Sequence, residues 1–220
     1  MTTVASSEPP VLEILPGTVS GPFDLAALFG NPGPVELEIG TGKGRFLLAQ
    51  AAARPDVNFL GIEWSLKYLR VTRDRAARGR LRNVRLFRAD ARHVLQALLP
   101  DRSIERLHVY CPDPWPKKRH HKRRVFSVSS LEQMARVLRP GGYLDLSTDV
   151  PEYFDEIREM ARQVPALREA TDPLFPAAAT EGRTSYEAKY LGAGRVIHRA
   201  SYARVDDGAR PAPGLRAARE

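Results

Sequence analysis

The chain has 220 residues, a formal net charge of +8 and a sequence pI near 9.9. With 43% hydrophobic and 27% charged residues, its composition is that of a globular protein and excludes a wholly disordered chain. No apolar run is long enough to span a bilayer, and no signal-peptide pattern opens the sequence. The single cysteine, Cys111, excludes an intrachain disulfide and fits a reducing compartment, so we expect a soluble cytoplasmic protein.

The length and the local composition predict one domain between two loose ends. Residues 1–20 are rich in Ser, Thr and Pro without clear periodicity, which indicates a loose N-terminal arm. Residues 206–220 contain prolines and glycines and few apolar residues, and we expect them to form a disordered tail. The domain is therefore predicted to span residues 21–205.

Short apolar runs alternate with helix-like segments along the domain. Strands are predicted at residues 35–39, 59–62, 84–87, 107–110 and 143–147. Helices are predicted at residues 45–53, 65–79, 91–99, 129–138 and 151–164, with Ser65 as a cap and Ser129 with Glu132 as a capping box. A last strand at 196–202 is expected to close one sheet edge, antiparallel to a partner near 166–170.

This alternation predicts an α/β fold in which a mostly parallel sheet carries helices on both faces and an antiparallel edge strand. Ligands of such folds bind at the carboxyl ends of the strands. Five acidic residues stand at or just beyond the ends of five successive strands: Glu38, Glu63, Asp90, Asp113 and Asp149. We expect them to share one rim of the sheet.

A glycine turn follows the first strand, with Gly40, Gly42 and Gly44 at alternate positions. The dinucleotide fingerprint requires Gly-x-Gly-x-x-Gly, and Arg45 stands where its third glycine would be, so a pyrophosphate is not favoured. Glu38 beside the turn suits a ligand with an ammonium and a sulfonium group, such as S-adenosylmethionine. In such a ligand, Glu63 at the end of the second strand would accept from the ribose hydroxyls, and Asp90 would lie near the adenine edge.

A rigid loop and a cationic segment follow the fourth strand. Prolines at positions 112, 114 and 116 restrict the backbone around Asp113 and Trp115, so both side chains are displayed in a loop of few conformations. Six Lys or Arg and two His then fall between Lys117 and Arg124, and no acid occurs between Asp113 and Glu132. This pattern predicts an acid in a fixed loop beside a segment that binds nucleic-acid phosphates.

Three motifs resemble those of the bacterial tRNA (guanine-N(7))-methyltransferase family: Glu38-Ile39-Gly40-Thr41-Gly42-Lys43-Gly44, Gly61-Ile62-Glu63, and Pro112-Asp113-Pro114-Trp115-Pro116-Lys117-Lys118-Arg119-His120. The resemblance covers roughly residues 35–204. It implies a Rossmann-like class I methyltransferase fold with a seven-stranded sheet. It also implies methyl transfer from S-adenosylmethionine to guanine N7 in the variable loop of tRNA, forming 7-methylguanosine. We expect tRNA as partner, and no metal, membrane or obligate protein partner.

The resemblance also implies roles for individual residues. The cofactor contacts would be Glu38, Gly40, Gly42, Glu63, Asp90 and Asp113. Asp113 would also be the catalytic residue. The substrate contacts would be Lys117, Asp149, Thr184, Ser185, Tyr186 and Glu187. The RNA contacts would be Arg119, His120, His121, Lys122, Arg123 and Arg124. One departure concerns the family's usual Thr-Lys-Phe-Glu box, which reads Thr-Ser-Tyr-Glu here and loses a positive charge at Ser185.

Guanine N7 carries a lone pair and no hydrogen, so its methylation needs no general base. We therefore expect Asp113 to act through position and charge, while Trp115 and Tyr186 either stack on the base or serve packing. The sequence at 113–116 also partly resembles the acid-or-amide, Pro-Pro, aromatic loop of exocyclic-amine methyltransferases, which keeps that activity open. The sequence leaves room as well for a nicotinamide-dependent oxidoreductase or for an RNA-binding protein without activity.

Overall fold

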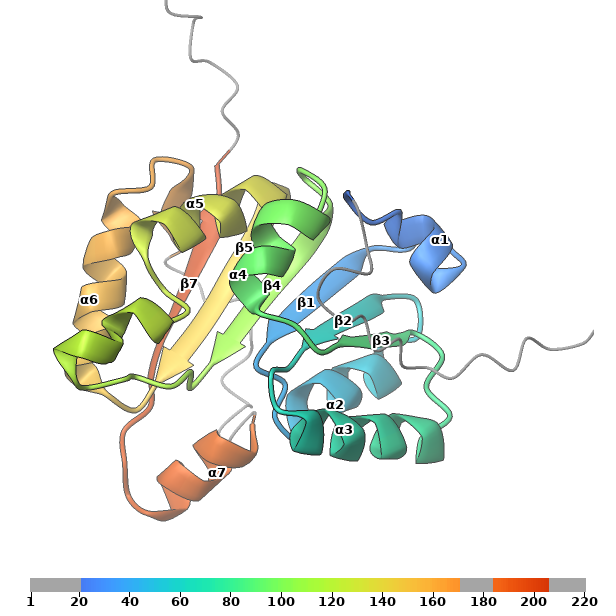
Figure 1. Ribbon diagram of the computed structural model, residues 1–220, viewed down its shortest axis with the longest axis horizontal. Helices are drawn as coiled ribbons and strands as arrows, with labels where there is room; N and C mark the ends of the chain where they lie inside the picture. Colours follow the sequence, from blue (N-terminus) through green and yellow to red (C-terminus); the bar gives the residue numbers. More distant parts are fainter. Residues whose placement is uncertain (1–20, 171–183, 206–220) are drawn as a thin grey trace, which may run out of the picture.

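The computed structural model describes residues 21–170 and 184–205, and these form one seven-stranded sheet with helices on both faces (Figure 1). The predicted N-terminal arm and C-terminal tail lie outside the described residues. The strand order is β3-β2-β1-β4-β5-β7-β6. The strands are β1 Val35–Ile39, β2 Asn58–Ile62, β3 Val84–Phe87, β4 Ile104–Tyr110, β5 Leu138–Thr148, β6 Leu167–Glu169 and β7 His198–Arg204.

The helices divide between the two faces of the sheet. They are α1 Leu25–Phe29, α2 Arg45–Ala53, α3 Leu66–Arg78, α4 Ala91–His93, α5 Val128–Val137, α6 Pro151–Arg162 and α7 Ser185–Gly192, with a π-helical turn η1 Val94–Leu98 and a 3₁₀ helix η2 Lys118–Arg123. Helices α2 and α3 bury one apolar cluster against one face, whereas η1, α5 and α6 bury a larger cluster against the other. No helix in the described ranges is long and apolar enough to cross a membrane.

Strand β1 is buried along its whole length even though it contains two acids. A central parallel strand is covered on both faces, so a charge there needs a partner. Glu36 has two, because the guanidinium of Arg54 donates to it at 2.6 and 2.8 Å and His108 Nε2 lies 3.0 Å from it. Burial opposes the charge of Glu36, but its hydrogen bonds with His108 and Arg54 outweigh burial and lower its pKa to about 2.

The structure confirms the predicted fold class and corrects the place of the last strand. Strand β7 was expected to close a sheet edge, but it lies between β5 and β6 and is antiparallel to both. Strand β5 is longer than predicted, and six of its residues pair with β7. The edge position therefore falls to the short strand β6, which is the predicted antiparallel partner.

Three local predictions also need correction. The capping box of α5 is formed by Ser127 and Ser130 and not by Ser129 with Glu132, because the helix begins one residue after Ser127. Ser65 is the N-cap residue of α3, but its side chain makes no capping bond. The helix expected at residues 91–99 is the short α4 followed by η1.

Gly61 in β2 marks a close approach between the sheet and the covering layer. A Cβ there would lie 2.7–2.8 Å from side-chain atoms of Leu86, Thr41 and Leu47. We predict that Gly61→Ala lowers the free energy of unfolding by about 1–3 kcal/mol, because the buried neighbours must move to admit the methyl group. Urea unfolding would measure this, with Gly192→Ala as control, since a Cβ at Gly192 meets nothing within 4 Å. Equal losses in both variants would contradict the prediction.

Candidate active site

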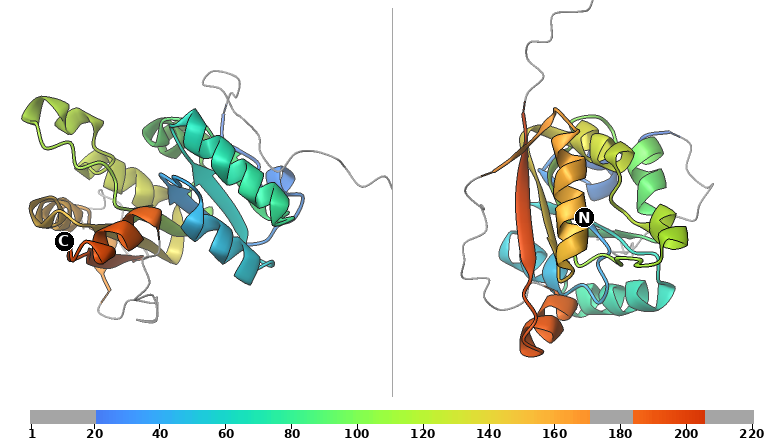
Figure 2. Two further views of the ribbon diagram at one scale, coloured as in Figure 1. Left: turned by 90° about the horizontal axis from the view of Figure 1, so that it is seen from below. Right: turned by 90° about the vertical axis from the view of Figure 1, so that its left-hand side faces the viewer.

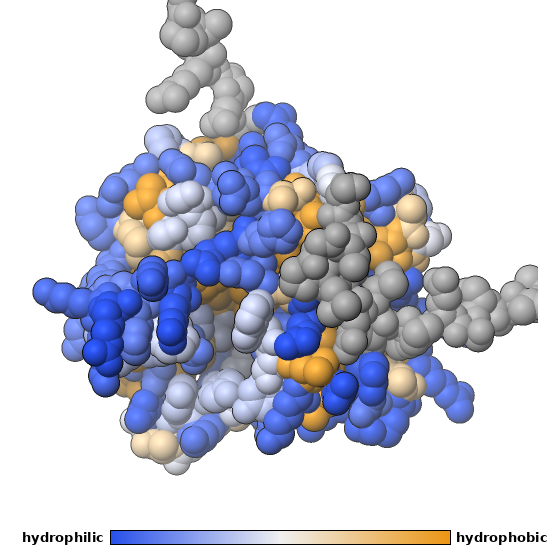
Figure 3. Space-filling model, in the orientation of Figure 1, coloured by the Kyte–Doolittle hydropathy of each residue, from blue (hydrophilic) through white to orange (hydrophobic). Residues whose placement is uncertain are grey.

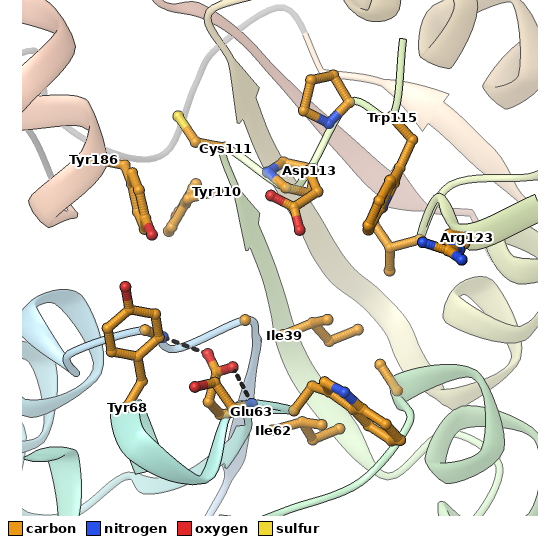
Figure 4. Close-up of a pocket in the computed structure, with 18 of the residues that line it drawn as sticks. Ile39, Ile62, Glu63, Tyr68, Tyr110, Cys111, Asp113, Trp115, Arg123 and Tyr186 are labelled. Carbon is orange, nitrogen blue, oxygen red and sulfur yellow. Dashed lines mark hydrogen bonds between the residues drawn. The ribbon is translucent and has the colours of Figure 1, made fainter. Parts of the chain in front are cut away.

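A cleft of about 900 Å³ lies at the carboxyl ends of β1, β2, β4 and β5. This volume is within the range of pockets that hold a small molecule or a cofactor. Four of the five acids predicted to share one rim line it: Glu63, Asp90, Asp113 and Asp149. Glu63 and Asp113 point into the cavity from opposite walls (Figure 4). The structure therefore brings together acids that lie far apart in the sequence.

The glycine turn after β1 is fixed by the acid that ends β2. Gly40, Gly42 and Gly44 have φ values of 79°, 54° and 72°, which favour glycine. The backbone N–H of Gly42 donates to Glu63 Oε2 at 2.8 Å, and the N–H of Ser65 donates to Glu63 Oε1 at 2.7 Å (Figure 4). The Gly42 N–H is therefore not free to bind a ligand. The Glu63 carboxylate still has lone pairs that can accept from a donor in the cleft.

Glu38 lies under the turn and does not line the cleft, although its neighbours Ile39 and Gly40 do. The residue is 1% exposed, it has a backbone hydrogen bond with Leu47, and its Oε2 has no hydrogen-bond partner in the described part of the chain. Burial raises its pKa to about 8, and the nearby negative charge of Glu63 adds to the rise. An unpartnered buried acceptor of this kind suits a cationic or hydrogen-bond-donating ligand group.

Asp90 forms the link between the cleft and the cationic segment. Its carboxylate caps α4 through the N–H of Arg92 at 2.9 Å and pairs with the Arg92 guanidinium at 2.7 Å. The hydrogen bond from the Arg92 side chain lowers the pKa of Asp90. Arg92 Nη1 also donates to the carbonyl of Lys122 in η2 at 2.8 Å. Arg92, which the sequence reasoning missed, thus fixes η2 next to the end of the cleft that Asp90 lines.

The loop that carries Asp113 is held in an unusual conformation. Cys111 and Trp115 have φ values of 46° and 43°, in the region that side-chain-bearing residues rarely adopt. The N–H of Cys111 extends the ladder by donating to the carbonyl of Ser147 at 2.8 Å. Asp113 itself is exposed to the cleft.

Arg124 holds this loop through a hydrogen bond to its backbone. Its Nε donates to the Pro114 carbonyl at 2.7 Å, its guanidinium pairs with Glu156 of α6, and its Cζ lies 4.5 Å from the ring centroid of Tyr153. The Arg124 side chain is only 9% exposed. The structure therefore places Arg124, one of the residues predicted to contact RNA, inside the protein.

The other residues of the predicted RNA-contacting segment lie in η2. Lys117 is the N-cap of η2, and Lys117, Arg119 and Lys122 are exposed outside the cleft, whereas His120 and His121 are half-buried. Of this segment, Arg123 lines the cleft, with its guanidinium 4.9 Å from the ring centroid of Trp115. One face of Trp115 is thus already covered (Figure 4).

The four predicted substrate residues in and before α7 are divided by the fold. Thr184 caps the helix, accepting from the N–H of Glu187 at 3.1 Å. Glu187 is 0% exposed, accepts from Ser147 Oγ at 2.6 Å and lies 3.4 Å from Arg199. Of the segment 184–187 only Tyr186 lines the cleft, so the structure does not bring Ser185 or Glu187 to it.

Tyr186 of α7 lies across the cleft from Tyr68 of α3. Interaction with the Tyr68 side chain, together with burial, raises the pKa of Tyr186 to about 12. The hydroxyl groups of Tyr186 and Tyr68 point toward each other in Figure 4. Tyr68 was not predicted, because nothing in its local sequence distinguishes it from other helical aromatic residues.

Asp149 pairs with a cation from the segment after α7. Arg195 Nη1 lies 2.6 Å from Asp149 Oδ2, and its guanidinium also lies 4.9 Å from the ring centroid of Tyr190. Asp149 does not cap α6, whose N-cap is Val150. Arg195 was missed because 46 residues separate it from Asp149, and no short motif signals such a pair.

Comparisons with known proteins agree with this geometry. A family model described as "Putative methyltransferase" matches residues 32–200. A tRNA (guanine-N(7)-)-methyltransferase of Chromohalobacter salexigens is 36% identical over 190 residues, covering 84% of this chain and 77% of that protein. One of Aromatoleum aromaticum is 39% identical over 176 residues, covering 80% of this chain and 68% of the relative. The chain belongs to the tRNA (guanine-N(7)-)-methyltransferase family.

Solved structures show the same fold as this family member at low sequence identity. The 16S rRNA methyltransferase KamB has a TM-score of 0.63 and 20% identity, covering 88% of this chain and 99% of that one. A 16S rRNA (adenine(1408)-N(1))-methyltransferase from Catenulisporales acidiphilia, with cosubstrate SAM, has a TM-score of 0.58 and 19% identity, covering 86% and 93%. The class I methyltransferase fold is thereby confirmed for this member of the tRNA (guanine-N(7)-)-methyltransferase family.

The buried carboxyl of Glu38 predicts a pH-dependent stability. Its pKa in the fold, about 8, is above the ordinary value of 4.5, so the protonated form is favoured by folding and its stabilisation is lost as pH rises from about 4.5 to about 8. We predict that over this window wild type loses up to about 1.4 kcal/mol of unfolding free energy per pH unit relative to Glu38→Gln.

Urea unfolding at several pH values from mildly acidic to mildly alkaline would measure this difference, with Glu36→Gln as the matched control. The Glu36 pKa is lowered to about 2, so that variant should be destabilised by a constant amount above about pH 5. Parallel stability curves for wild type and Glu38→Gln would contradict the prediction.

Proposed function

We propose that this chain transfers a methyl group from S-adenosylmethionine to N7 of guanine in the variable loop of tRNA, forming 7-methylguanosine. The observation that carries the proposal is the cleft in which Glu63 and Asp113 face each other beside the cationic helix η2. Such a cleft suits a cationic donor and a base, and the adjoining helix suits a polyanion. Membership of the tRNA (guanine-N(7)-)-methyltransferase family supports the same reaction and partner.

The residues of the cleft fit S-adenosylmethionine. Glu38 does not line the cleft but lies next to Ile39 and Gly40, which do, and it offers a buried oxygen without a partner among the described residues, which suits the ammonium group of the donor. Glu63 keeps lone pairs for the ribose hydroxyls while it fixes the turn, and Asp90 lies at the same end of the cleft for the adenine edge. When bound, S-adenosylmethionine supplies an electrophilic sulfonium methyl group.

Asp113 is the proposed catalytic residue. Its carboxylate points into the cleft from the wall opposite Glu63, and the loop around it is restrained by Cys111, Trp115 and Arg124 (Figure 4). Guanine N7 needs no deprotonation, so Asp113 acts by accepting from the base's N–H groups and stabilising the positive charge that develops on the ring. Preorganisation of this kind needs the rigid loop that the prolines provide.

Asp149 and Tyr186 complete the base-binding wall in this proposal. Asp149 is an acceptor, which suits the N–H donors of guanine's Watson–Crick edge, and Arg195 holds it in place. Tyr186 is 44% exposed and can stack on an extruded base, whereas one face of Trp115 is already covered by Arg123. Adenine presents an acceptor at N1 and would face Asp149 unfavourably.

The cations of η2 are proposed to hold the tRNA backbone. Lys117, Lys118, Arg119 and Lys122 are exposed next to the cleft, and none forms an ion pair with a carboxylate within the described ranges. Phosphate contacts position a nucleic acid without reading its sequence. The folded shape of tRNA would then supply the selectivity.

The product formed from undermethylated tRNA tests the proposed function. Purified protein, undermethylated tRNA and methyl-labelled S-adenosylmethionine should yield labelled 7-methylguanosine after digestion to nucleosides. Labelled N2-methylguanosine or N6-methyladenosine would favour an exocyclic-amine methyltransferase. Either of these products, or absence of transfer, would contradict the proposal.

The division between chemistry and RNA binding gives a second prediction. Asp113→Asn should lower the single-turnover rate of methyl transfer by about 10²–10³-fold with tRNA affinity nearly unchanged, because it removes transition-state stabilisation in an isosteric side chain. The variant Lys118→Ala/Arg119→Ala/Lys122→Ala should instead weaken tRNA binding and lower the slope of log K against log salt by about 2. Single-turnover kinetics and filter binding at several salt concentrations measure both effects. Similar losses of rate and affinity in the two variants would count against this division.

A further inference from the structure

The positive charge of the chain is concentrated in a stretch that the cleft does not account for. Residues 66–88 contain nine Lys or Arg and one acid, Asp74, so this stretch alone carries a formal charge of +8. The remaining residues hold 25 Lys or Arg and 25 Asp or Glu, and are balanced. The net charge of the whole protein therefore resides in α3 and the segment that leads from it through β3.

Helix α3 turns its cations outward for a simple reason. Its buried residues Leu69, Thr72 and Ala76 recur every three or four positions and pack against the sheet side. The opposite stripe is exposed, and Arg70 and Arg78 lie on it about two helical turns apart, with Asp74 between them ion-paired to Arg73 at 3.0 Å. Arg75 is also exposed but donates to the Lys43 carbonyl at 2.9 Å. We call the other exposed cations of this helix and of the turn that follows it the α3 basic surface: Lys67, Arg70, Arg78, Arg80 and Arg82.

The α3 basic surface has no acidic partner among the residues that the structure describes. None of its five cations forms an ion pair with a carboxylate there, whereas exposed arginines elsewhere do. Arg139 pairs with Glu105 at 2.6 Å, and Arg162 pairs with Glu159 at 2.8 Å. Unpaired like charges along one helix repel one another, and a polyanion relieves this repulsion.

The position of α3 relates its surface to the cleft. Ser65 and Tyr68, at the start of the helix, line the cleft, and the helix then leads away from it for ~20 Å, as its 13 residues imply. In the right-hand view of Figure 2 both α3 and the cationic helix η2 lie toward the right of the molecule, and the left-hand view shows them apart along its length. Figure 3 shows hydrophilic side chains over the region of η2 and over the region of α3. An extended polyanion that occupies the cleft can therefore contact both surfaces.

We propose that the α3 basic surface is a second phosphate-binding surface for tRNA, which holds a part of the molecule distant from the guanine in the cleft. The inference rests on the proposed function, because it takes tRNA as the polyanion. Helix η2 holds phosphates near the target base, and α3 holds the backbone beyond it. The two surfaces together orient the folded tRNA, and neither reads base sequence.

The variant Arg70→Ala/Arg78→Ala/Arg82→Ala tests this surface. Alanine is a good helix former, and none of the three side chains forms an ion pair with a described carboxylate, so the fold should be retained. We expect KM for full-length tRNA to rise by at least about 10-fold, kcat to stay within about twofold, and the salt slope of tRNA binding to fall by about 2. The affinity for S-adenosylhomocysteine, measured by calorimetry, should not change.

A control variant with the same loss of charge is Arg139→Ala/Arg162→Ala/Arg168→Ala, on the side of β5, β6 and α6. It should keep the wild-type KM and salt slope for tRNA. The proposal is overturned if the α3 variant binds tRNA with wild-type affinity and slope, or if the control loses as much. Failure of the proposed function would be seen separately, as absence of 7-methylguanosine from wild-type reactions.

Discussion

The hydrogen bond from the Gly42 N–H to the Glu63 carboxylate fixes the turn on which the proposed ligand site depends. It joins the turn after β1 to the end of β2 and holds the Glu63 carboxylate at one wall of the cleft. In dinucleotide-binding sheets the same turn offers free N–H groups to a pyrophosphate. Here the N–H is engaged by an acid, and Arg45 replaces the third glycine. We infer that this interaction makes the turn better suited to a cationic ligand than to a phosphate.

The convergence of acids has an electrostatic cost that the surrounding guanidinium groups reduce. Asp90 is paired with Arg92 and Asp149 with Arg195, so the charges of two of the four cleft acids are balanced by ion pairs. Glu63 is held by backbone N–H groups, and the described residues place no ion pair on Asp113. Negative potential therefore remains between the two opposite walls, where a sulfonium and a base that gains positive charge would meet.

Topology explains what the sequence could and could not predict. Strand ends of a parallel sheet meet at one edge, so the gathering of Glu63 and Asp113 followed from the order of strands and helices. The burial of Glu187 depends on packing against β5 and β7, and the pair of Asp149 with Arg195 joins segments 46 residues apart. Local patterns do not encode such contacts. The place of β7 inside the sheet was likewise decided by long-range strand pairing.

The central claim is that the acid-fixed glycine turn selects a cationic methyl donor over a phosphate-bearing cofactor. Thermal unfolding of the purified chain in the presence of S-adenosylmethionine, NAD⁺ or NADP⁺ tests it most directly, because a ligand of the folded state raises the melting temperature. S-adenosylmethionine should raise the melting temperature in a concentration-dependent way, and neither nicotinamide cofactor should change it. A rise with NAD⁺ or NADP⁺ and none with S-adenosylmethionine would contradict the account.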